Sequence, residues 1–249
     1  MYMSVVAYKT GVPVYPELAG ARVLITGLTS SRGVDVARAF ADHKARLVIQ
    51  SPESSPEMTA LAAVLTESAA EVKLFNDPFA SADDAVRLAQ TAAQDYGGLD
   101  AVINLVTLEP GGIAREASFA DVEAFVSAKL LFAALLTRVS ANRMRLTWTE
   151  GAILNVLCMS ARARDHEAAL ADVAHATLAA MTHGEAKEWA EHGIRINAAG
   201  PRPSAEGPSG AVVTSEADIA ALALYLASKK GKGLSGHVFD VEGIAARRC

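Results

Sequence analysis

Short runs rich in Val, Ile and Leu alternate along this chain with longer stretches whose apolar residues recur at helical spacing. Such alternation is typical of βαβ units, which build a parallel sheet with helices on both faces. Runs such as Val23-Leu24-Ile25 contain no polar residue, as expected of strands that helices cover on both sides. The pattern predicts a doubly wound, three-layer α/β/α fold with seven parallel strands, near Arg22–Thr26, Arg46–Gln50, Val72–Phe75, Ala101–Asn104, Ala152–Leu157, Arg195–Ala198 and Val238–Val241.

The stretches between the strands carry signals for the start of a helix. A serine three positions ahead of an acidic residue is the capping-box arrangement, in which the hydroxyl binds backbone N–H groups of the first turn. This arrangement occurs at Ser81 with Asp84, Ser118 with Asp121, and Ser215 with Asp218.

The length and charge of the chain bound its organisation and its partners. With 249 residues, 51% of them hydrophobic, the chain can bury one substantial core, so we expect residues 1–18 to be an N-terminal extension and residues 19–249 a single domain. The formal net charge of −5, with scattered Lys and Arg, argues against nucleic acid as a partner. The first eighteen residues lack a basic start and a long apolar stretch, so neither a signal peptide nor a membrane span is expected.

The number and spacing of the cysteines and histidines argue against a disulfide framework and against a metal-binding site. Cys158 and Cys249 are the two cysteines, so no disulfide framework and no CxxC metal site can be built. We therefore expect a protein of the reducing cytoplasm. No metal site is predicted either, because the spacing of a metal motif such as HxxxH is missing at His166, His175, His183 and His192.

The first predicted strand leads into a short loop with two glycines, and a helix is predicted next, from Val34 to His43. The phosphates of a dinucleotide lie against backbone N–H groups at a helix N-terminus, so glycine is needed where a side chain would block that approach. Gly27 and Gly33 meet this need, although a tight turn without a ligand is the alternative. Arg32 either reaches a phosphate or is solvated. We assign cofactor contacts in this loop to Thr26, Gly27, Ser30, Ser31, Arg32 and Gly33.

The loop resembles the TGxxxGxG motif of the short-chain dehydrogenase/reductase family, with Ser31 in place of the middle glycine. Further segments resemble the family in the same order along the chain, from about Gly20 to Gly243. They are Gly98–Thr107, where only Asn104 of the NNAG motif is kept, Gly151–Val156, His192–Pro201, Leu226–Ser228 and Leu234–Gly243. The resemblance implies a Rossmann-type fold that binds NAD or NADP.

The resemblance also implies further cofactor contacts. Ser51 stands where an acid would hold the adenosine ribose, and Pro52 where an arginine would hold the 2′-phosphate of NADP, so neither cofactor is favoured. Asp77 matches the residue that contacts adenine, or is a turn residue before Pro78. Asn104, Val106 and Pro201 complete the set of predicted cofactor contacts.

The catalytic residues that the resemblance implies are missing. The family's tyrosine, which exchanges a proton with the substrate, falls on Ala171, and the lysine that lowers the phenol pKa falls on His175. Cys158 stands at the serine position, and the segment from Ser127 to Lys129 lacks the helix asparagine. The segment that would cover the substrate, residues 202–214, is short. Since no tyrosine occurs between Tyr96 and Tyr225, an error in register cannot restore one.

Two hypotheses follow from these substitutions. The first is a non-catalytic, dinucleotide-binding subunit with a regulatory or assembly role. Helices near Phe119–Val139 and Ala168–Ala190 have the apolar faces that this family buries in homodimers and homotetramers, and a hetero-oligomer with an active relative is also open. The alternative is an atypical NAD(P)-dependent oxidoreductase for a carbonyl or hydroxyl compound, using water, Cys158 or His175, with Lys129 near such a Cys/His dyad.

Overall fold

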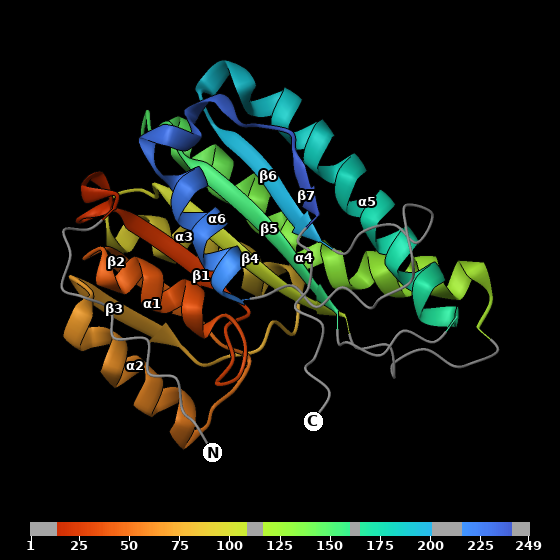
Figure 1. Cartoon of the computed structure of the whole chain (residues 1–249), viewed down its shortest axis with the longest axis horizontal. Coiled ribbons are helices and arrows are strands. Elements are labelled where there is room, and N and C mark those ends of the chain that lie inside the picture. The colour runs from red at the N-terminus through yellow and green to blue at the C-terminus, as the bar shows by residue number, and fades with distance from the viewer. Residues whose placement is uncertain (1–13, 109–116, 160–164, 201–215, 241–249) are drawn as a thin grey trace.

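The computed structural model describes residues 14–108, 117–159, 165–200 and 216–240 (Figure 1). Predictions that fall on Pro201, on the segment 202–214, on the cap at Ser215 and on Cys249 lie outside these residues.

The seven strands form one parallel sheet in the order β3-β2-β1-β4-β5-β6-β7, which confirms the predicted Rossmann-type fold. The order reverses between β1 and β4, and such a reversal opens a crevice at the carboxyl ends of the strands, where this class of fold binds its ligands. The strands are β1 (Arg22–Thr26), β2 (Arg46–Gln50), β3 (Glu71–Phe75), β4 (Ala101–Leu108), β5 (Ala152–Met159), β6 (Arg195–Gly200) and β7 (Val238–Asp240).

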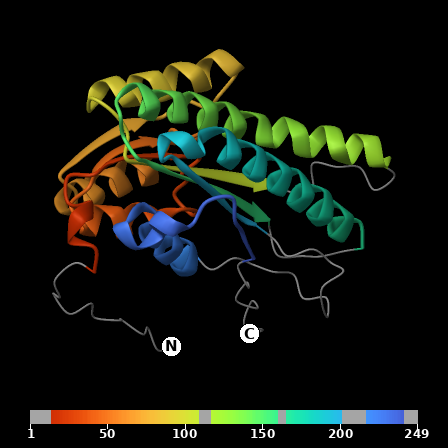
Figure 2. The same cartoon turned by 90° about the horizontal axis from the view of Figure 1, so that it is seen from above.

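Helices cover both faces of the sheet, as Figure 2 shows. One layer holds α1 (Val34–Asp42), α2 (Pro56–Ser68) and α6 (Glu216–Ala227). The other holds α3 (Ala82–Asp95), α4 (Phe119–Leu146) and α5 (Asp165–Trp189). Short 3-10 turns lie at Pro16–Leu18, Ala190–His192 and Lys229–Gly233. None of the helices in the described parts of the chain is long and apolar enough to cross a membrane.

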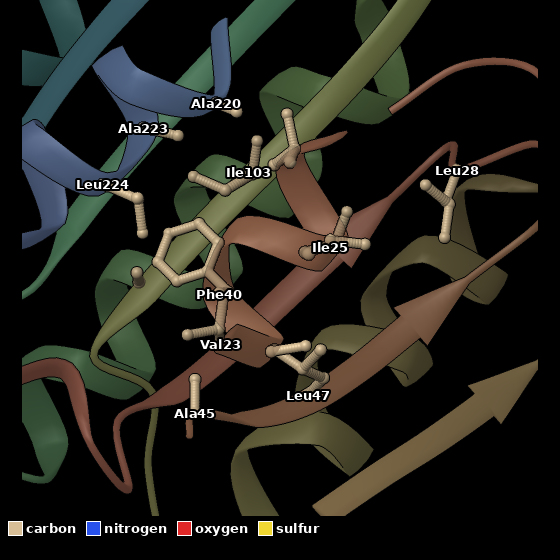
Figure 3. Packing of buried hydrophobic residues seen from close by; sticks show 14 of the residues in the cluster. Val23, Ile25, Leu28, Phe40, Ala45, Leu47, Ile103, Ala220, Ala223 and Leu224 are labelled. Atoms are coloured by element: carbon tan, nitrogen blue, oxygen red, sulfur yellow. The ribbon is translucent and has the colours of Figure 1, made fainter. Parts of the chain in front are cut away.

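The face of the sheet under α1 and α6 buries a continuous apolar cluster around Phe40 (Figure 3). Phe40 is fully buried, and it lies among strand residues such as Val23 and Leu47 and helix residues such as Ala223 and Leu224. Alanines on α6 leave room for this ring, which is why α1 and α6 pack closely. Their close packing brings the start of α6 to the start of α1.

Local signals predict the bounds of β1 and β2 and the first residues of α3 and α4 correctly. Ser81 and Ser118 each accept a hydrogen bond from the backbone of the acidic residue three positions on, which confirms two of the predicted capping boxes. β4 and β5 run further than predicted and pair over eight residues, up to Leu108 and Met159. This extension places Cys158 opposite Thr107 of β4 and beyond the last pair of β5 with β6, at the carboxyl edge of the sheet.

Candidate functional site

The loop between β1 and α1 lies directly against the backbone of β4. Gly27 has a φ of +74° and Gly33 a φ of +80°, a left-handed conformation that glycine adopts without strain. A Cβ atom at Gly27 would overlap the carbonyl oxygen of Leu105, and one at Gly33 would overlap the Leu105 side chain. The backbone contact requires glycine at position 27 whether or not a ligand binds. At position 33 the left-handed backbone favours glycine, and a larger residue would have to displace the ends of the Leu105 and Leu28 side chains.

The N–H groups of this loop donate to acceptors within the chain. The Gly27 N–H donates to Oε1 of Gln50 at 2.9 Å, and the Ser30 N–H donates to Oε2 of Glu53 at 2.9 Å. Thr29 and Arg32 exchange backbone hydrogen bonds, at 3.0 and 3.4 Å, and so close a tight turn over the exposed Ser30 and Ser31. Ser31, which replaces the family's middle glycine, thus sits at the tip of a self-contained turn.

The N-terminus of α1 is bound by a carboxylate from the far end of the chain. The Gly33 N–H donates to Oε1 of Glu216 at 2.9 Å, and the Asp35 N–H lies 3.4 Å from Oε2 of the same side chain. No side chain from α1 itself caps this helix. Glu216 is the first residue of α6, and 183 positions separate it from Gly33. It satisfies N–H groups that would otherwise lack a partner in the helix.

Residues at the end of β2 and just after it form hydrogen bonds with the same loop. The fully buried Ser51 accepts a hydrogen bond from the Glu53 N–H at 3.0 Å, which holds Glu53 beneath Ser30. The Gln50 side chain bridges two segments, since its Nε2 donates to the carbonyl oxygen of Asp77 at 2.7 Å. The Asp77 side chain is exposed in the turn that leads to α3. Ser51 therefore replaces the acidic residue expected at this position, and its hydroxyl holds the backbone of the acidic Glu53.

Asn104 belongs to a buried polar network in the centre of the sheet. Thr26 donates to Oδ1 of Asn104 at 3.0 Å, and Nδ2 of Asn104 donates to Oδ1 of Asn155 at 2.8 Å. The Thr137 hydroxyl of α4 donates to the same Asn155 oxygen at 3.1 Å. The network ties β1, β4, β5 and α4 together just below the crevice. Val106, further along β4, is half-buried.

The positions that the sequence motifs match with the family's serine, tyrosine and lysine lie on β5 and α5. Cys158 is half-buried near the end of β5, and Ala171 and His175 lie one turn apart on α5, both half-buried. Burial raises the pKa of the Cys158 thiol to about 11; Glu216 adds to the increase, and Arg32 opposes it. A thiol with this pKa is protonated at neutral pH, so it is a poor base and a poor nucleophile.

Tyrosines in the described part of the chain lie away from this edge of the sheet. The Tyr96 hydroxyl donates to the carbonyl oxygen of Leu47, near the start of β2, at 3.3 Å. The Tyr15 ring lies 5.9 Å from that of His43, the residue that follows α1. Tyr225 lies near the end of α6, where its carbonyl oxygen accepts a hydrogen bond from Ser228.

Sequence reasoning did not assign a role to Gln50, Glu53 or Glu216. A local signal for Glu53 existed, because it follows the end of β2, where the family's cofactor-selecting residue lies. Glu216 gave no such signal, because its contact with Gly33 depends on the packing of α6 against α1.

Comparison with known proteins identifies the family. The family model described as short chain dehydrogenase matches residues 21–207, and the chain belongs to this family. A mitochondrial borneol dehydrogenase from Lavandula x intermedia is 28% identical over 249 residues, covering 91% of each chain. An uncharacterized oxidoreductase of Mycobacterium tuberculosis is 33% identical over 184 residues, covering 72% of this chain and 66% of the relative.

Solved structures of the same class support the fold. A short-chain dehydrogenase/reductase from Serratia marcescens superposes with a TM-score of 0.73 at 18% identity, covering 92% of this chain and 99% of the other. A short-chain dehydrogenase from Burkholderia cenocepacia, in complex with NADP, superposes with a TM-score of 0.72 at 20% identity, covering 92% and 98%. Members of this family of oxidoreductases commonly bind NAD or NADP and form oligomers.

The phosphate loop of this chain does not fit the diphosphate group of such a cofactor in the conformation described. A bound diphosphate would need N–H groups at the start of α1 as donors. Here Glu53 and Glu216 already accept from Ser30, Gly33 and Asp35. Metal chemistry finds no support in the described residues, since no group of three or more His, Cys, Asp or Glu among them could hold a metal ion.

Proposed function

We propose that this protein is a member of the short-chain dehydrogenase family without tyrosine-dependent hydride transfer, and that it acts as a regulatory or assembly subunit. The observation that carries this proposal is the occupancy of the catalytic positions: Ala171 replaces the phenol and His175 the lysine. Alanine has no group that can exchange a proton with a carbonyl oxygen. NAD or NADP, where either binds, then serves as a regulatory ligand.

The state of Cys158 supports this proposal over the alternative of an atypical oxidoreductase. A Cys/His pair needs a thiolate or a readily ionised thiol, and the raised pKa of Cys158, about 11, disfavours both near neutral pH. Burial is the main cause of this shift; the positive charge of Arg32 lowers the pKa, and the negative charge of Glu216 raises it by a smaller amount.

Turnover by the purified full-length chain tests the proposal. NADH and NADPH consumption is followed with a panel of aldehydes and ketones, beside an active member of the family as positive control. We expect no consumption above the protein-free rate. Contradiction would come from turnover that Cys158→Ala or His175→Ala abolishes, while His183→Ala, an exposed histidine on the same helix, retains it.

An assembly role predicts self-association or a partner subunit. α4 exposes large apolar side chains, among them Phe119 at 69%, Leu131 at 49% and Leu146 at 53%. Burial of such residues between subunits favours a homodimer or homotetramer, or a hetero-oligomer with an active relative. Sedimentation equilibrium measures the mass directly. A monomer at all concentrations, both alone and with an active relative, would contradict this role.

A further inference from the structure

We propose that Glu216 and Glu53 are internal ligands of the phosphate loop, which keep a dinucleotide diphosphate out until both carboxylates leave. This inference rests on the proposed function, because it states how the cofactor site of this non-catalytic member is controlled. The ligand concerned is any nucleotide that presents a diphosphate to the start of α1.

The contacts of Glu216 are those of an anion bound at a helix N-terminus. Its two carboxylate oxygens face the N–H groups of Gly33 and Asp35, at 2.9 and 3.4 Å. A helix N-terminus carries a partial positive charge and N–H donors without intrahelical partners, so it attracts phosphate and carboxylate for the same reason. A phosphate and the Glu216 carboxylate therefore compete for the same donors.

Glu53 closes the other side of the loop. Its Oε2 accepts from the Ser30 N–H at 2.9 Å, and its own N–H donates to the buried Ser51 hydroxyl at 3.0 Å. The carboxylate thus belongs to the segment that follows β2, and the hydrogen bond to Ser51 holds the backbone of Glu53 in place. Glu53 and Glu216 place two negative charges beside one short loop. They repel a diphosphate by charge, and they also occupy the N–H donors of the loop that it would need.

The influence of Glu216 extends toward the catalytic positions. Its charge acts on the thiol of Cys158, at the end of β5, as well as on the N-terminus of α1. The carboxylate therefore lies within electrostatic range of both the phosphate loop and the β5 edge, the two regions between which a dinucleotide would extend. Arg32, on the loop itself, acts on the same thiol with the opposite sign.

Charge-neutral variants separate this role from simple helix capping. In Glu53→Gln the amide oxygen can still accept from the Ser30 N–H, and in Glu216→Gln it can still accept from the Gly33 N–H, while the weaker contact with the Asp35 N–H is lost. Each change therefore keeps the main hydrogen bond and removes the negative charge. The matched controls are Asp218→Asn and Glu57→Gln, which make the same change at exposed positions of α6 and α2. The dissociation constants of NADPH and of inorganic pyrophosphate are measured by calorimetry for each full-length variant.

We expect the Glu53→Gln/Glu216→Gln double variant to bind NADPH and pyrophosphate at least about tenfold more tightly than the wild-type chain, because each lost charge removes a competing charge-assisted contact. The control variants should bind as the wild type does. Unchanged dissociation constants in a folded double variant would overturn the inference.

The two proposals fail in different ways. If the double variant binds NADPH tightly and also reduces carbonyls, the control of the site is correct and the non-catalytic assignment is wrong. If the double variant binds NADPH no more tightly than the wild type does, and neither protein reduces carbonyls, the non-catalytic assignment stands and the inference is wrong.

Hydrogen exchange of the wild-type chain supplies a test that needs no variant. Saturating pyrophosphate should keep the Gly33 amide protected while exchange at the first turn of α6 becomes faster, because Glu216 is displaced. Pyrophosphate that protects the loop and leaves the first turn of α6 unchanged would contradict the proposal.

Discussion

Replacing Gly27 with alanine would place a Cβ atom against the backbone of Leu105, inside van der Waals contact with its carbonyl oxygen and 3.2 Å from its carbonyl carbon. Two costs then add. A non-glycine residue in the left-handed conformation, here at φ +74°, costs about 1–2 kcal/mol. Forcing an atom into a packed interior costs typically about 1–3 kcal/mol more, and the atoms that must move here are backbone.

Gly97→Ala is the matched control for this change. Gly97 has nearly the same φ, +71°, but a Cβ atom there would meet nothing within 4 Å. We therefore expect Gly97→Ala to lower the free energy of unfolding by only about 1–2 kcal/mol, and Gly27→Ala by about 2–5 kcal/mol.

Urea denaturation of both variants, followed by circular dichroism, measures the difference. A larger loss of unfolding free energy for Gly27→Ala than for Gly97→Ala, with the same slope of that free energy against urea concentration, supports a loop packed on β4. Equal losses at the two positions would refute it, because the Leu105 contact would then contribute nothing.

Four further predictions concern stability and reactivity. Phe40→Ala should lower the free energy of unfolding by about 3–5 kcal/mol in urea denaturation, since the ring is fully buried; a loss under about 1 kcal/mol would contradict the packing. Burial raises the pKa of Asp100, but hydrogen bonds from Arg22 outweigh burial and lower the pKa below 3.8. The ionised Asp100 therefore stabilises the folded state fully above pH 3.8, and this stabilisation is lost as the pH falls further. Asp100→Asn should therefore cost about 1–2 kcal/mol at pH 7, and in acid-dependent denaturation this cost should shrink as the pH falls below 3.8, whereas a cost independent of pH would contradict the ion pair. Because the folded-state pKa of Cys158 is raised from 9.0 to about 11, stability should decline as the pH rises from 9 toward 11, and Cys158→Ala should remove that part of the decline. Iodoacetamide labelling at pH 8, mapped by mass spectrometry to separate Cys158 from Cys249, should be slow until urea unfolds the chain; rapid native labelling of Cys158 would contradict its raised pKa.

The fold could be predicted from sequence wherever the signal is local. β1 and β2 have the expected bounds because each is a short apolar run that ends in a turn. The serine caps of α3 and α4 are local for the same reason, since donor and acceptor lie three residues apart. β4 and β5 were predicted too short because their last residues are held by pairing with each other, a contact that neither segment shows alone.

The candidate site divides in the same way. The prediction that Ala171 and His175 stand in place of the tyrosine and the lysine comes from motif order, because it requires only counting along the chain. The occupied phosphate loop is not evident, since Glu216 meets Gly33 only after α6 has packed beside α1. Ser31, the most visible departure in the motif, is exposed at a turn, whereas the acceptors of the loop N–H groups come from elsewhere.

Transfer of deuterium from the C4 position of labelled NADPH to a panel of carbonyl compounds, detected by mass spectrometry, tests the central claim most directly. The measurement uses the wild-type chain and the Glu53→Gln/Glu216→Gln variant, so that absent transfer in a cofactor-bound protein points to the missing phenol. The predicted result is NADPH bound to the variant with no deuterium in any product. Deuterium in an alcohol product from either protein, at a rate above that of free NADPH, would contradict the claim that this chain has lost hydride transfer.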